Sequence, residues 1–386
     1  MRLPIIGGVH VEPYRIAVPD AVLDDLRDRI LRTRWPDEAP GEPWSQGVDR
    51  AYLRDLLAYW ADGFDWRSRE RALNRYEHRL AEVDGVRLHF VHHRAPGGGV
   101  PLVLTHGWPS TFLEPLGLVD RLGDRFDLVV PSLPGYAFSR RPPRVGVDRE
   151  FVAHLWHRLM QGLGYERYGA CGGDFGAGVA TSMALSQPER MTGIHVSTPE
   201  MSPYTGPGTP PLSPEERAYV DHVAGWDATQ RGYSAVQSTR PQTLGYGLSD
   251  SPAGLAAWVL DKWRSWSDSA GDLDATFGRD ALLTMLTVWW VSNSITSSMR
   301  DYYDNRWHGT ALGPDDLVRV PTAIAVFANE LVPEGEPPRS WFERLYRVRR
   351  WTVFPRGGHF AAAEVPDLLA ADIAAFFTGP RGVSPS

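Results

Sequence analysis

The sequence predicts an α/β protein in which a mainly parallel sheet is flanked by helices, with a helical insertion over one end of the sheet. From residue 101 onward, short apolar runs alternate with segments of helical pattern. These runs are continuously apolar, which is typical of strands buried on both faces of a parallel sheet. The stretch 200–312 interrupts the series, because it has several helical patterns and little strand pattern. The predicted strands are Leu102–Thr105, Leu128–Val130, Tyr168–Cys171, Ile194–Ser197, Ala323–Phe327 and Trp351–Phe354.

The first part of the chain, residues 1–95, is predicted to be a helical region that wraps the core. Apolar residues recur at helical spacing over 20–30, directly after Pro19, and again over 52–60. Apolar and polar residues alternate over 86–90, which predicts one half-buried strand.

The rest of the chain is predicted to form four parts. A first section of the α/β core spans 96–199, and a second section spans 313–378. The insertion between them, 200–312, begins with a proline-rich entry and is predicted to form a helical lid over one end of the sheet. The tail, 379–386, is predicted to be disordered.

Composition excludes several classes of protein. The chain has 386 residues, a net charge of −7 and no basic block, so we expect no nucleic-acid partner. The single cysteine, Cys171, excludes a disulfide framework and a cysteine-rich metal site, and we expect it to be a small buried residue. The single lysine, Lys262, follows Asp261, which excludes a Gly-Lys-Ser/Thr phosphate loop. We expect Lys262 to lie on a surface helix.

No segment predicts secretion or membrane insertion. The apolar run Met1–Ile6 is too short for a secretory signal. The most apolar stretch, Ala281–Val291, is far shorter than the roughly 20 residues that a membrane-spanning helix needs. We therefore expect a cytoplasmic protein with no membrane partner.

The segment Gly172–Gly176 is the sharpest local feature of the sequence. It lies between a predicted strand and a predicted helix over 177–185, and small residues flank the central Asp174. A strand-to-helix turn this tight is a nucleophile elbow, which presents its central side chain at the end of a sheet. A carboxylate near a helix N-terminus stays ionised and can attack an electrophilic carbon. The alternative is a glycine-rich turn in which Asp174 only caps the helix.

A second loop, His106–Pro109, follows an early strand of the predicted sheet. A loop in this place can turn a backbone N–H toward the elbow, as an oxyanion hole requires. We expect the two donors to be the amides of Trp108 and Phe175, and we expect His106 to have a structural role.

The last predicted strand is followed by Gly357–Phe360, which places His359 where the histidine of a nucleophile–acid–histidine series is expected. The acid of such a series ends the preceding strand, and Glu330 does so. Glu334 and Glu336 lie close enough in the sequence to be alternatives.

Taken together, these residues resemble the microsomal-type epoxide hydrolases, a branch of the α/β-hydrolase fold. The resemblance covers nearly the whole chain and includes the segments Arg356–Ala362, Ser251–Ala257 and Gln230–Tyr233. It implies an α/β-hydrolase fold with a helical lid and a helical N-terminal extension. The membrane anchor of the microsomal members is absent, so we expect a soluble member. Phe175 stands where the family often has Trp, which is expected to reshape the pocket wall without changing the chemistry.

The resemblance also implies two lid tyrosines that hydrogen-bond an epoxide oxygen. Tyr233 matches the first and Tyr302 the second, although the adjacent Tyr303 is an alternative. The implied reaction converts an epoxide to a vicinal diol. Asp174 attacks an epoxide carbon to form an ester, and His359, with its acid partner, activates the water that hydrolyses this ester. Neither a metal nor an organic cofactor is implied.

The implied substrates are water and a small apolar or aryl epoxide. Whether the chain forms a homo-oligomer stays open. The resemblance extends to actinobacterial enzymes of natural-product pathways, some of which make enediyne antibiotics, and one lysine among 40 basic residues fits such a source. We therefore expect a role in antibiotic biosynthesis. Two alternatives remain: a haloalkane dehalogenase, which needs halide-binding donors instead of paired tyrosines, and an inactive hydrolase-fold binding protein. An esterase is disfavoured because the elbow lacks serine.

Overall fold

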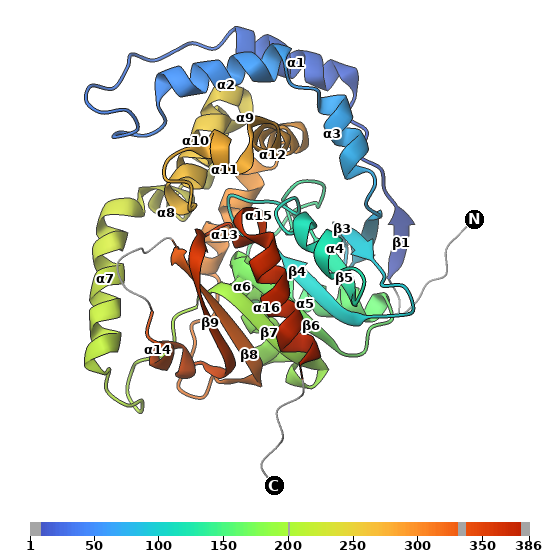
Figure 1. Ribbon diagram of the computed structural model, residues 1–386, viewed down its shortest axis with the longest axis vertical. Helices are drawn as coiled ribbons and strands as arrows, with labels where there is room; N and C mark the ends of the chain where they lie inside the picture. Colours follow the sequence, from blue (N-terminus) through green and yellow to red (C-terminus); the bar gives the residue numbers. More distant parts are fainter. Residues whose placement is uncertain (1–8, 200, 331–336, 380–386) are drawn as a thin grey trace.

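The structure, a computed structural model, describes residues 9–199, 201–330 and 337–379. Its centre is a nine-stranded sheet in the order β1-β2-β3-β5-β4-β6-β7-β8-β9 (Figure 1). From β5 to β9 every neighbouring pair is parallel, whereas β1, β2 and β3 extend the sheet through antiparallel pairs. The strands are β1 (His10–Pro13), β2 (His78–Val83), β3 (Val86–His93), β4 (Val100–Thr105), β5 (Phe126–Pro131), β6 (Tyr168–Asp174), β7 (Met191–Pro199), β8 (Val318–Asn329) and β9 (Tyr346–Gly358).

All six strands predicted for the core are present, so the mainly parallel sheet is confirmed. The sequence pattern does not predict β1 or β2, because β1 is very short and β2 mixes charged with apolar residues. The prediction that β3 is half-buried is wrong. His89 and His92 are buried, and His89 is held by hydrogen bonds of 2.9 Å to His78 and to the Ser132 hydroxyl. These bonds let polar residues occupy a buried face.

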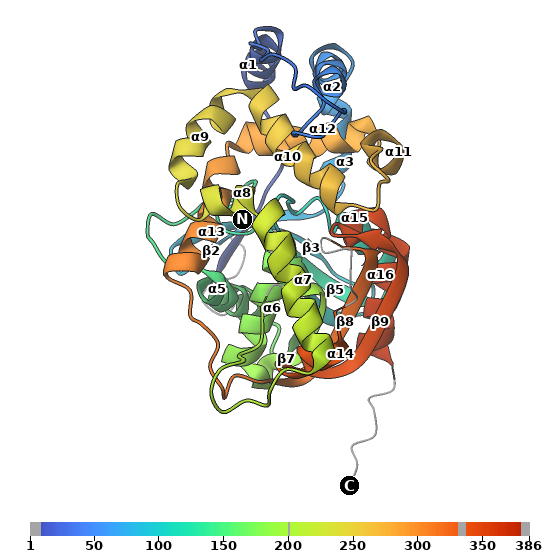
Figure 2. The same cartoon turned by 90° about the vertical axis from the view of Figure 1, so that its left-hand side faces the viewer.

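Helices cover both faces of the sheet. Figure 2 shows α5 (Arg149–Gly162) and α6 (Phe175–Ser186) on one side of the strands and α16 (Pro366–Thr378) on the other, and α4 (Leu116–Leu122) packs beside α16 (Figure 1). Helix α6 is almost entirely buried, because it packs against α5 and against β4, β6, β7 and β8. This packing holds the carboxyl ends of the central strands at one edge of the sheet.

The predicted helical insertion contains seven helices among the described residues; all but the first lie above that edge, and the first runs down beside the sheet (Figure 1). None of the helices in the described ranges is both long enough and apolar enough to cross a membrane. The seven helices are α7 (Pro214–Gln230), α8 (Gly232–Gln237), α9 (Pro241–Asp250), α10 (Pro252–Trp266), α11 (Leu273–Phe277), α12 (Arg279–Ser292) and α13 (Ile295–Trp307).

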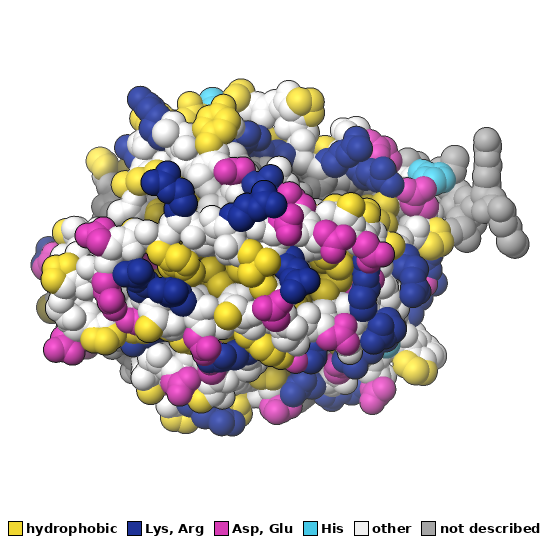
Figure 3. Space-filling model, turned by 90° about the horizontal axis from the view of Figure 1, so that it is seen from above, with side chains coloured by type: hydrophobic (Ala, Val, Ile, Leu, Met, Phe, Trp, Pro, Cys, Tyr) yellow, Lys and Arg dark blue, Asp and Glu magenta, His cyan; other side chains and the backbone are white. Residues whose placement is uncertain are grey.

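Three N-terminal helices, α1 (Asp20–Leu31), α2 (Arg50–Asp62) and α3 (Trp66–Leu73), lie over α10 and α12. A buried hydrogen bond of 2.9 Å from the Trp60 indole to the Thr287 hydroxyl joins α2 to α12. Seen from above, this end of the molecule has a band of hydrophobic side chains with arginines on both sides (Figure 3). The N-terminal region therefore braces the insertion, and it also supplies β1, β2 and β3 to the sheet. The short elements η1 (Pro188–Arg190), α14 (Arg339–Glu343) and α15 (Ala361–Glu364) complete the chain.

Candidate active site

Asp174 lies at the junction of β6 and α6, with the left-handed backbone angles φ 52° and ψ −128°. The turn is so tight that a Cβ on Gly176 would lie 2.1 Å from the Thr105 carbonyl oxygen, so only glycine fits there. A non-glycine residue held in this conformation is strained, and such strain is concentrated at functional sites. The predicted strand–turn–helix is therefore confirmed. Cys171 on β6 is buried beside it, as expected.

The loop after β4 brings a backbone donor to the Asp174 carboxylate. The Trp108 amide donates a 2.9 Å hydrogen bond to Asp174 Oδ1. Gly107 permits this approach, because a Cβ there would lie 2.6 Å from the same oxygen. His106 faces the backbone instead: its Nε2 accepts from the Leu133 amide at 3.2 Å, and burial lowers the pKa of its imidazole to about 4. A neutral histidine bound to the backbone fits the structural role expected for it.

His359 follows β9 directly and lies between two carboxylates. Its Nδ1 is 3.0 Å from Glu330 Oε1, and its Nε2 is 3.7 Å from Asp174 Oδ2. Glu330 follows β8 directly, where the acid was expected. The two alternatives, Glu334 and Glu336, lie outside the described residues.

The charges of this cluster are coupled. Burial alone would lower the pKa of His359, but the hydrogen bond to Glu330 and the charges of Glu330 and Asp174 outweigh it and raise the pKa to about 9. Burial raises the pKa of Asp174, whereas the His359 charge and the two backbone amides of Trp108 and Phe175 favour its ionised form. A histidine with this pKa is protonated at neutral pH, and its positive charge favours the ionised form of the neighbouring Asp174.

Five aromatic rings form one cluster that includes the two residues whose amides face Asp174: those of Trp108, Phe175, Tyr233, Trp266 and Tyr302. Tyr233 on α8 stacks on Trp108 with a centroid distance of 5.5 Å, and its ring lies 5.8 Å from that of Tyr302. Tyr302 on α13 also contacts Phe175 edge to face at 4.9 Å. The insertion thus packs two tyrosines against Trp108 and Phe175, the two residues whose backbone amides face Asp174.

The adjacent Tyr303 lies elsewhere. Its ring packs near Trp307 and His308 at centroid distances of 6.4 and 6.2 Å. Successive residues of a helix point in different directions, and here Tyr302 is the one that contacts the aromatic rings of the site.

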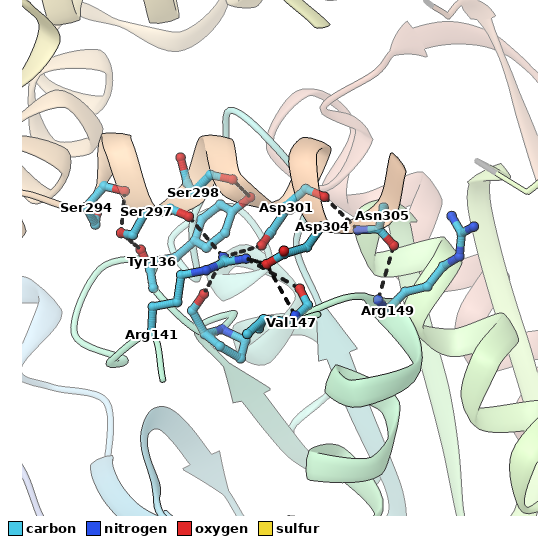
Figure 4. A network of polar contacts seen from close by, with 12 residues as sticks. Tyr136, Arg141, Val147, Arg149, Ser294, Ser297, Ser298, Asp301, Asp304 and Asn305 are labelled. Atoms are coloured by element: carbon cyan, nitrogen blue, oxygen red, sulfur yellow. Dashed lines mark hydrogen bonds and ion pairs between the residues drawn. The ribbon is translucent and has the colours of Figure 1, made fainter. Parts of the chain in front are cut away.

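A buried ion cluster anchors the helix that carries Tyr302 (Figure 4). Arg141, in the loop after β5, binds Asp301 at 2.5 Å and Asp304 at 2.6 Å, and all three side chains are nearly inaccessible to solvent. Burial raises the pKa of Asp301 to about 6, although Arg141 opposes this shift. Removing one partner of such a cluster leaves an uncompensated buried charge, which costs about 3–5 kcal/mol. The position of α13 over the site is therefore strongly specified.

The expectation of a surface position for Lys262 is wrong. Its side chain is only 14 % exposed and is paired with Asp261 at 2.6 Å. The ammonium lies 5.2 Å from the centroid of the Tyr233 ring and 5.8 Å from that of Trp266. The alkyl stem of lysine packs readily on apolar surface, which the helical pattern of α10 does not reveal.

Two residues of the site are not predicted by the sequence analysis. Trp266 contacts His359 edge to face at 5.0 Å, and its carbonyl accepts a 2.9 Å hydrogen bond from the His359 amide. Glu114 lines the cavity that also contains Asp174 and His359. A charged residue eight positions after His106 in an otherwise apolar stretch is a signal that could have identified Glu114. Among the residues that the structure describes, no three His, Cys, Asp or Glu side chains are arranged to hold a metal ion.

Comparison with known proteins places the chain in a family. The model described as "Epoxide hydrolase N terminus" matches residues 11–115, and that of the "alpha/beta hydrolase fold" matches residues 100–263. A protein of Stigmatella aurantiaca named "Putative epoxide hydrolase" is 39 % identical over 375 residues, which cover 94 % of this chain and 84 % of that protein. The chain belongs to the microsomal-type epoxide hydrolase family.

The similarity extends to epoxide hydrolases of animals and fungi. "Epoxide hydrolase 1" of Sus scrofa is 30 % identical over 95 % of this chain and 88 % of its own length. The crystal structure of juvenile hormone epoxide hydrolase from Bombyx mori superposes with a TM-score of 0.82 at 28 % identity, covering 96 % of this chain and 94 % of that one. The epoxide hydrolase of Aspergillus niger gives a TM-score of 0.82 at 27 % identity, over 95 % and 96 % of the two chains. The α/β-hydrolase fold is therefore confirmed, and epoxide hydrolases are hydrolases that act on ether bonds.

Proposed function

We propose that this epoxide hydrolase converts an apolar epoxide to a vicinal diol through a covalent ester on Asp174. The observation that carries the proposal is the position of Asp174 in the elbow, 3.7 Å from the His359–Glu330 pair, with the rings of two lid tyrosines on that of Trp108, whose amide binds Asp174. The aromatic enclosure favours an apolar or aryl-substituted substrate. Formation of a vicinal diol from styrene oxide, followed by chromatography, tests the activity directly.

In the first step, Asp174 Oδ2 attacks one carbon of the epoxide. Oδ1 is the atom held by the Trp108 amide, which leaves Oδ2 as the nucleophile. The ring C–O bond breaks while Tyr233 and Tyr302 donate hydrogen bonds to the departing oxygen. One phenol transfers its proton, so this oxygen becomes a hydroxyl group of the ester, and the phenolate regains a proton that the His359 imidazolium releases through solvent. A phenol ordinarily loses its proton only near pH 10, so it is a competent donor at neutral pH.

In the second step, a water attacks the carbonyl carbon of the Asp174 ester. His359 Nε2 takes the proton of this water, while Glu330 holds the Nδ1 side of the ring. The oxyanion that develops on Oδ1 is stabilised by the amides of Trp108 and Phe175. When the intermediate collapses, the bond between the Asp174 carbonyl carbon and the ester oxygen breaks, and the diol oxygen takes the proton from His359. The oxygen of the water stays in the Asp174 carboxyl group, whose remaining proton passes to His359 and restores the resting state.

The charges of the site order these two steps. In the resting enzyme, His359 is protonated and cannot act as a base, because its pKa is raised to about 9. Part of that increase comes from the negative charge of Asp174, which the ester no longer carries. Alkylation therefore lowers the pKa of His359, which increases the fraction of the neutral imidazole that the second step needs, while Glu330 continues to raise this pKa.

We expect the dealkylation rate to rise with pH, with an apparent pKa lower than that of His359 in the free enzyme, which Glu330 and Asp174 raise to about 9. The sign follows from the base, which acts only in its neutral form. Rapid-quench measurements of ester decay against pH give the pKa of His359 in the ester form, and NMR titration gives the pKa of His359 in the free enzyme. Equal pKa values in the two forms would contradict the coupling.

The lid phenols give a second expected result. Tyr233→Phe and Tyr302→Phe should each slow alkylation by roughly ten- to a thousand-fold, because each removes a donor to the developing alkoxide. The double variant should nearly abolish epoxide opening while ester hydrolysis changes little. Stopped-flow measurement of a single turnover separates the rate of alkylation from the rate of ester hydrolysis.

The matched control is Tyr303→Phe, which removes the hydroxyl of the neighbouring tyrosine that packs near Trp307 and His308. It should leave alkylation unchanged. A halide leaves without a proton, so a dehalogenase would tolerate the loss of both phenols and would release chloride from a haloalkane. If the double variant opened epoxides at the wild-type rate, the two tyrosines would only pack in the lid and would not be donors to the epoxide oxygen.

A further inference from the structure

A small cavity lies beside Asp174 on the side of the core. We call it the inner cavity; its volume is about 40 Å³, and its walls include Ser110, Glu114, Asp174 and His359. Its remaining walls include buried residues of β4, β6 and α16, and neither lid tyrosine lines it. A water needs about 10–15 Å³ and two to four polar partners. The inner cavity offers both, next to the carboxylate that the proposed reaction esterifies.

A second cavity, the outer cavity, adjoins the first and has a volume of about 450 Å³. It is bounded by α3, α11, α12 and the loop before α4; Figure 2 shows these helices on one side of the molecule. Ala72, Arg75 and Ala281 line it and are exposed, so it opens to solvent. Ser110 and Glu114 line both cavities. These two side chains therefore form the partition between solvent and the carboxylate side of the site.

Glu114 is the charged member of this partition. Burial raises the pKa of its carboxyl to about 7, while a hydrogen bond from the Ser110 hydroxyl and the charge of His359 act in the opposite direction. Glu114 in turn is one of the carboxylates that raise the pKa of His359. Glu114 is a half-buried acid, and burying such a group among apolar residues costs free energy. Its side chain lines the same water-sized space as His359, the proposed base.

We propose that Glu114 positions the hydrolytic water, and that this water enters through the outer cavity, on the side opposite to the epoxide. The inference rests on the proposed function, because it assumes an ester on Asp174. One hydrogen of the water is given to His359 Nε2, and its oxygen forms the new bond to the ester carbon. The other hydrogen is donated to the Glu114 carboxylate in a hydrogen bond. Glu114 gains and loses no proton over the cycle, so it is a positioning residue.

A positioning role and a purely electrostatic role of Glu114 predict opposite effects on the rate of ester hydrolysis. Glu114→Gln removes one of the negative charges that keep His359 protonated, so a purely electrostatic role would leave ester hydrolysis equal or faster at neutral pH. A positioning role predicts the opposite sign. Misplacing a reacting atom by about 1 Å can cost on the order of a hundred-fold in rate.

The experiment compares Glu114→Gln with the wild-type enzyme on styrene oxide. We expect kcat to fall by about ten- to a hundred-fold. KM should fall in parallel, so that kcat/KM changes by less than about three-fold, because alkylation is untouched and the ester accumulates. Intact-mass spectrometry during turnover should show the enzyme carrying one added substrate mass. Glu114→Met, of similar size and without an acceptor for the water, should be slower still.

Glu364→Gln is the matched control. Burial also raises the pKa of Glu364 to about 7, but its two oxygens accept from the amides of Asp268 and Phe360 at 2.6 and 2.9 Å. It should lower the melting temperature without accumulation of ester. If Glu114→Gln and Glu364→Gln behave alike, Glu114 has only a structural role and the inference is wrong.

Ala281→Trp tests the route while leaving Glu114 in place, because this exposed residue lines the outer cavity. We expect slower ester hydrolysis at an unchanged alkylation rate, and unchanged ester hydrolysis would refute entry through this cavity. Failure of the water-positioning inference and failure of the proposed function give different experimental results. An ester trapped by loss of His359 but not by loss of Glu114 would overturn only the inference, whereas no ester in any variant would overturn the proposed function as well.

Discussion

Asp174→Asn should reduce diol formation by at least about a thousand-fold, since the anionic nucleophile is lost and a neutral amide replaces it. Folding should be preserved, because asparagine has nearly the same size and, like aspartate, tolerates a left-handed backbone such as the φ of 52° found here. Steady-state diol formation measures the loss, and circular dichroism with a melting curve provides the control for folding.

Isotope labelling shows whether the loss reflects covalent chemistry. In a single turnover of the wild-type enzyme in ¹⁸O water, label should enter the Asp174 carboxylate before it appears in the diol, because the water attacks the ester carbonyl. Mass spectrometry of the peptide that contains Asp174 detects this label. Direct labelling of the diol with an unlabelled enzyme would show that water attacks the epoxide itself, and the ester mechanism would then be wrong.

His359→Gln should separate the two half-reactions. Alkylation needs no base and should continue, whereas hydrolysis of the ester should slow by roughly a hundred- to ten-thousand-fold without its general base. The enzyme should then carry one added substrate mass on the Asp174 peptide, detectable by intact-mass spectrometry after mixing with excess epoxide. An unmodified His359→Gln enzyme that still forms diol would contradict the role proposed for this histidine.

Glu330→Gln provides the companion measurement. It keeps the hydrogen bond to His359 Nδ1 within reach but removes the charge, so ester hydrolysis should slow less than in His359→Gln. Full activity of Glu330→Gln, together with an inactive Glu334→Gln or Glu336→Gln, would show that the acid partner of His359 is one of these two residues, which lie outside the described ranges.

The nucleophile elbow and the two residues that end β8 and β9 were predictable because each depends on local sequence. A glycine-rich turn between a strand and a helix specifies Asp174, and chain order specifies Glu330 and His359. The two lid tyrosines depended on the family resemblance, since helical spacing alone does not tell Tyr302 from Tyr303. The segment boundaries, the disordered tail, the oligomeric state and the role in antibiotic biosynthesis stay predictions.

Three features were beyond sequence reasoning because they arise from contacts between distant segments. β3 is buried on both faces because His89 finds hydrogen-bond partners on β2 and beyond β5. Glu114 faces His359 only after the loop before α4 meets the end of β9. Lys262 is covered because its ammonium lies over the rings of Tyr233 and Trp266. Each of these polar groups is placed by tertiary structure rather than by local pattern.

The covered position of Lys262 has a practical consequence for labelling. Apart from the terminal amine, this residue is the sole primary amine of the chain, and its side chain is 14 % exposed. An amine-acylating reagent should therefore produce one internal labelled peptide, at a rate that reports how often α10 moves away from Tyr233. Immobilisation through amines would attach the enzyme mainly by its terminus and so in a uniform orientation. Few enzymes offer such a probe beside the substrate enclosure without prior removal of other lysines.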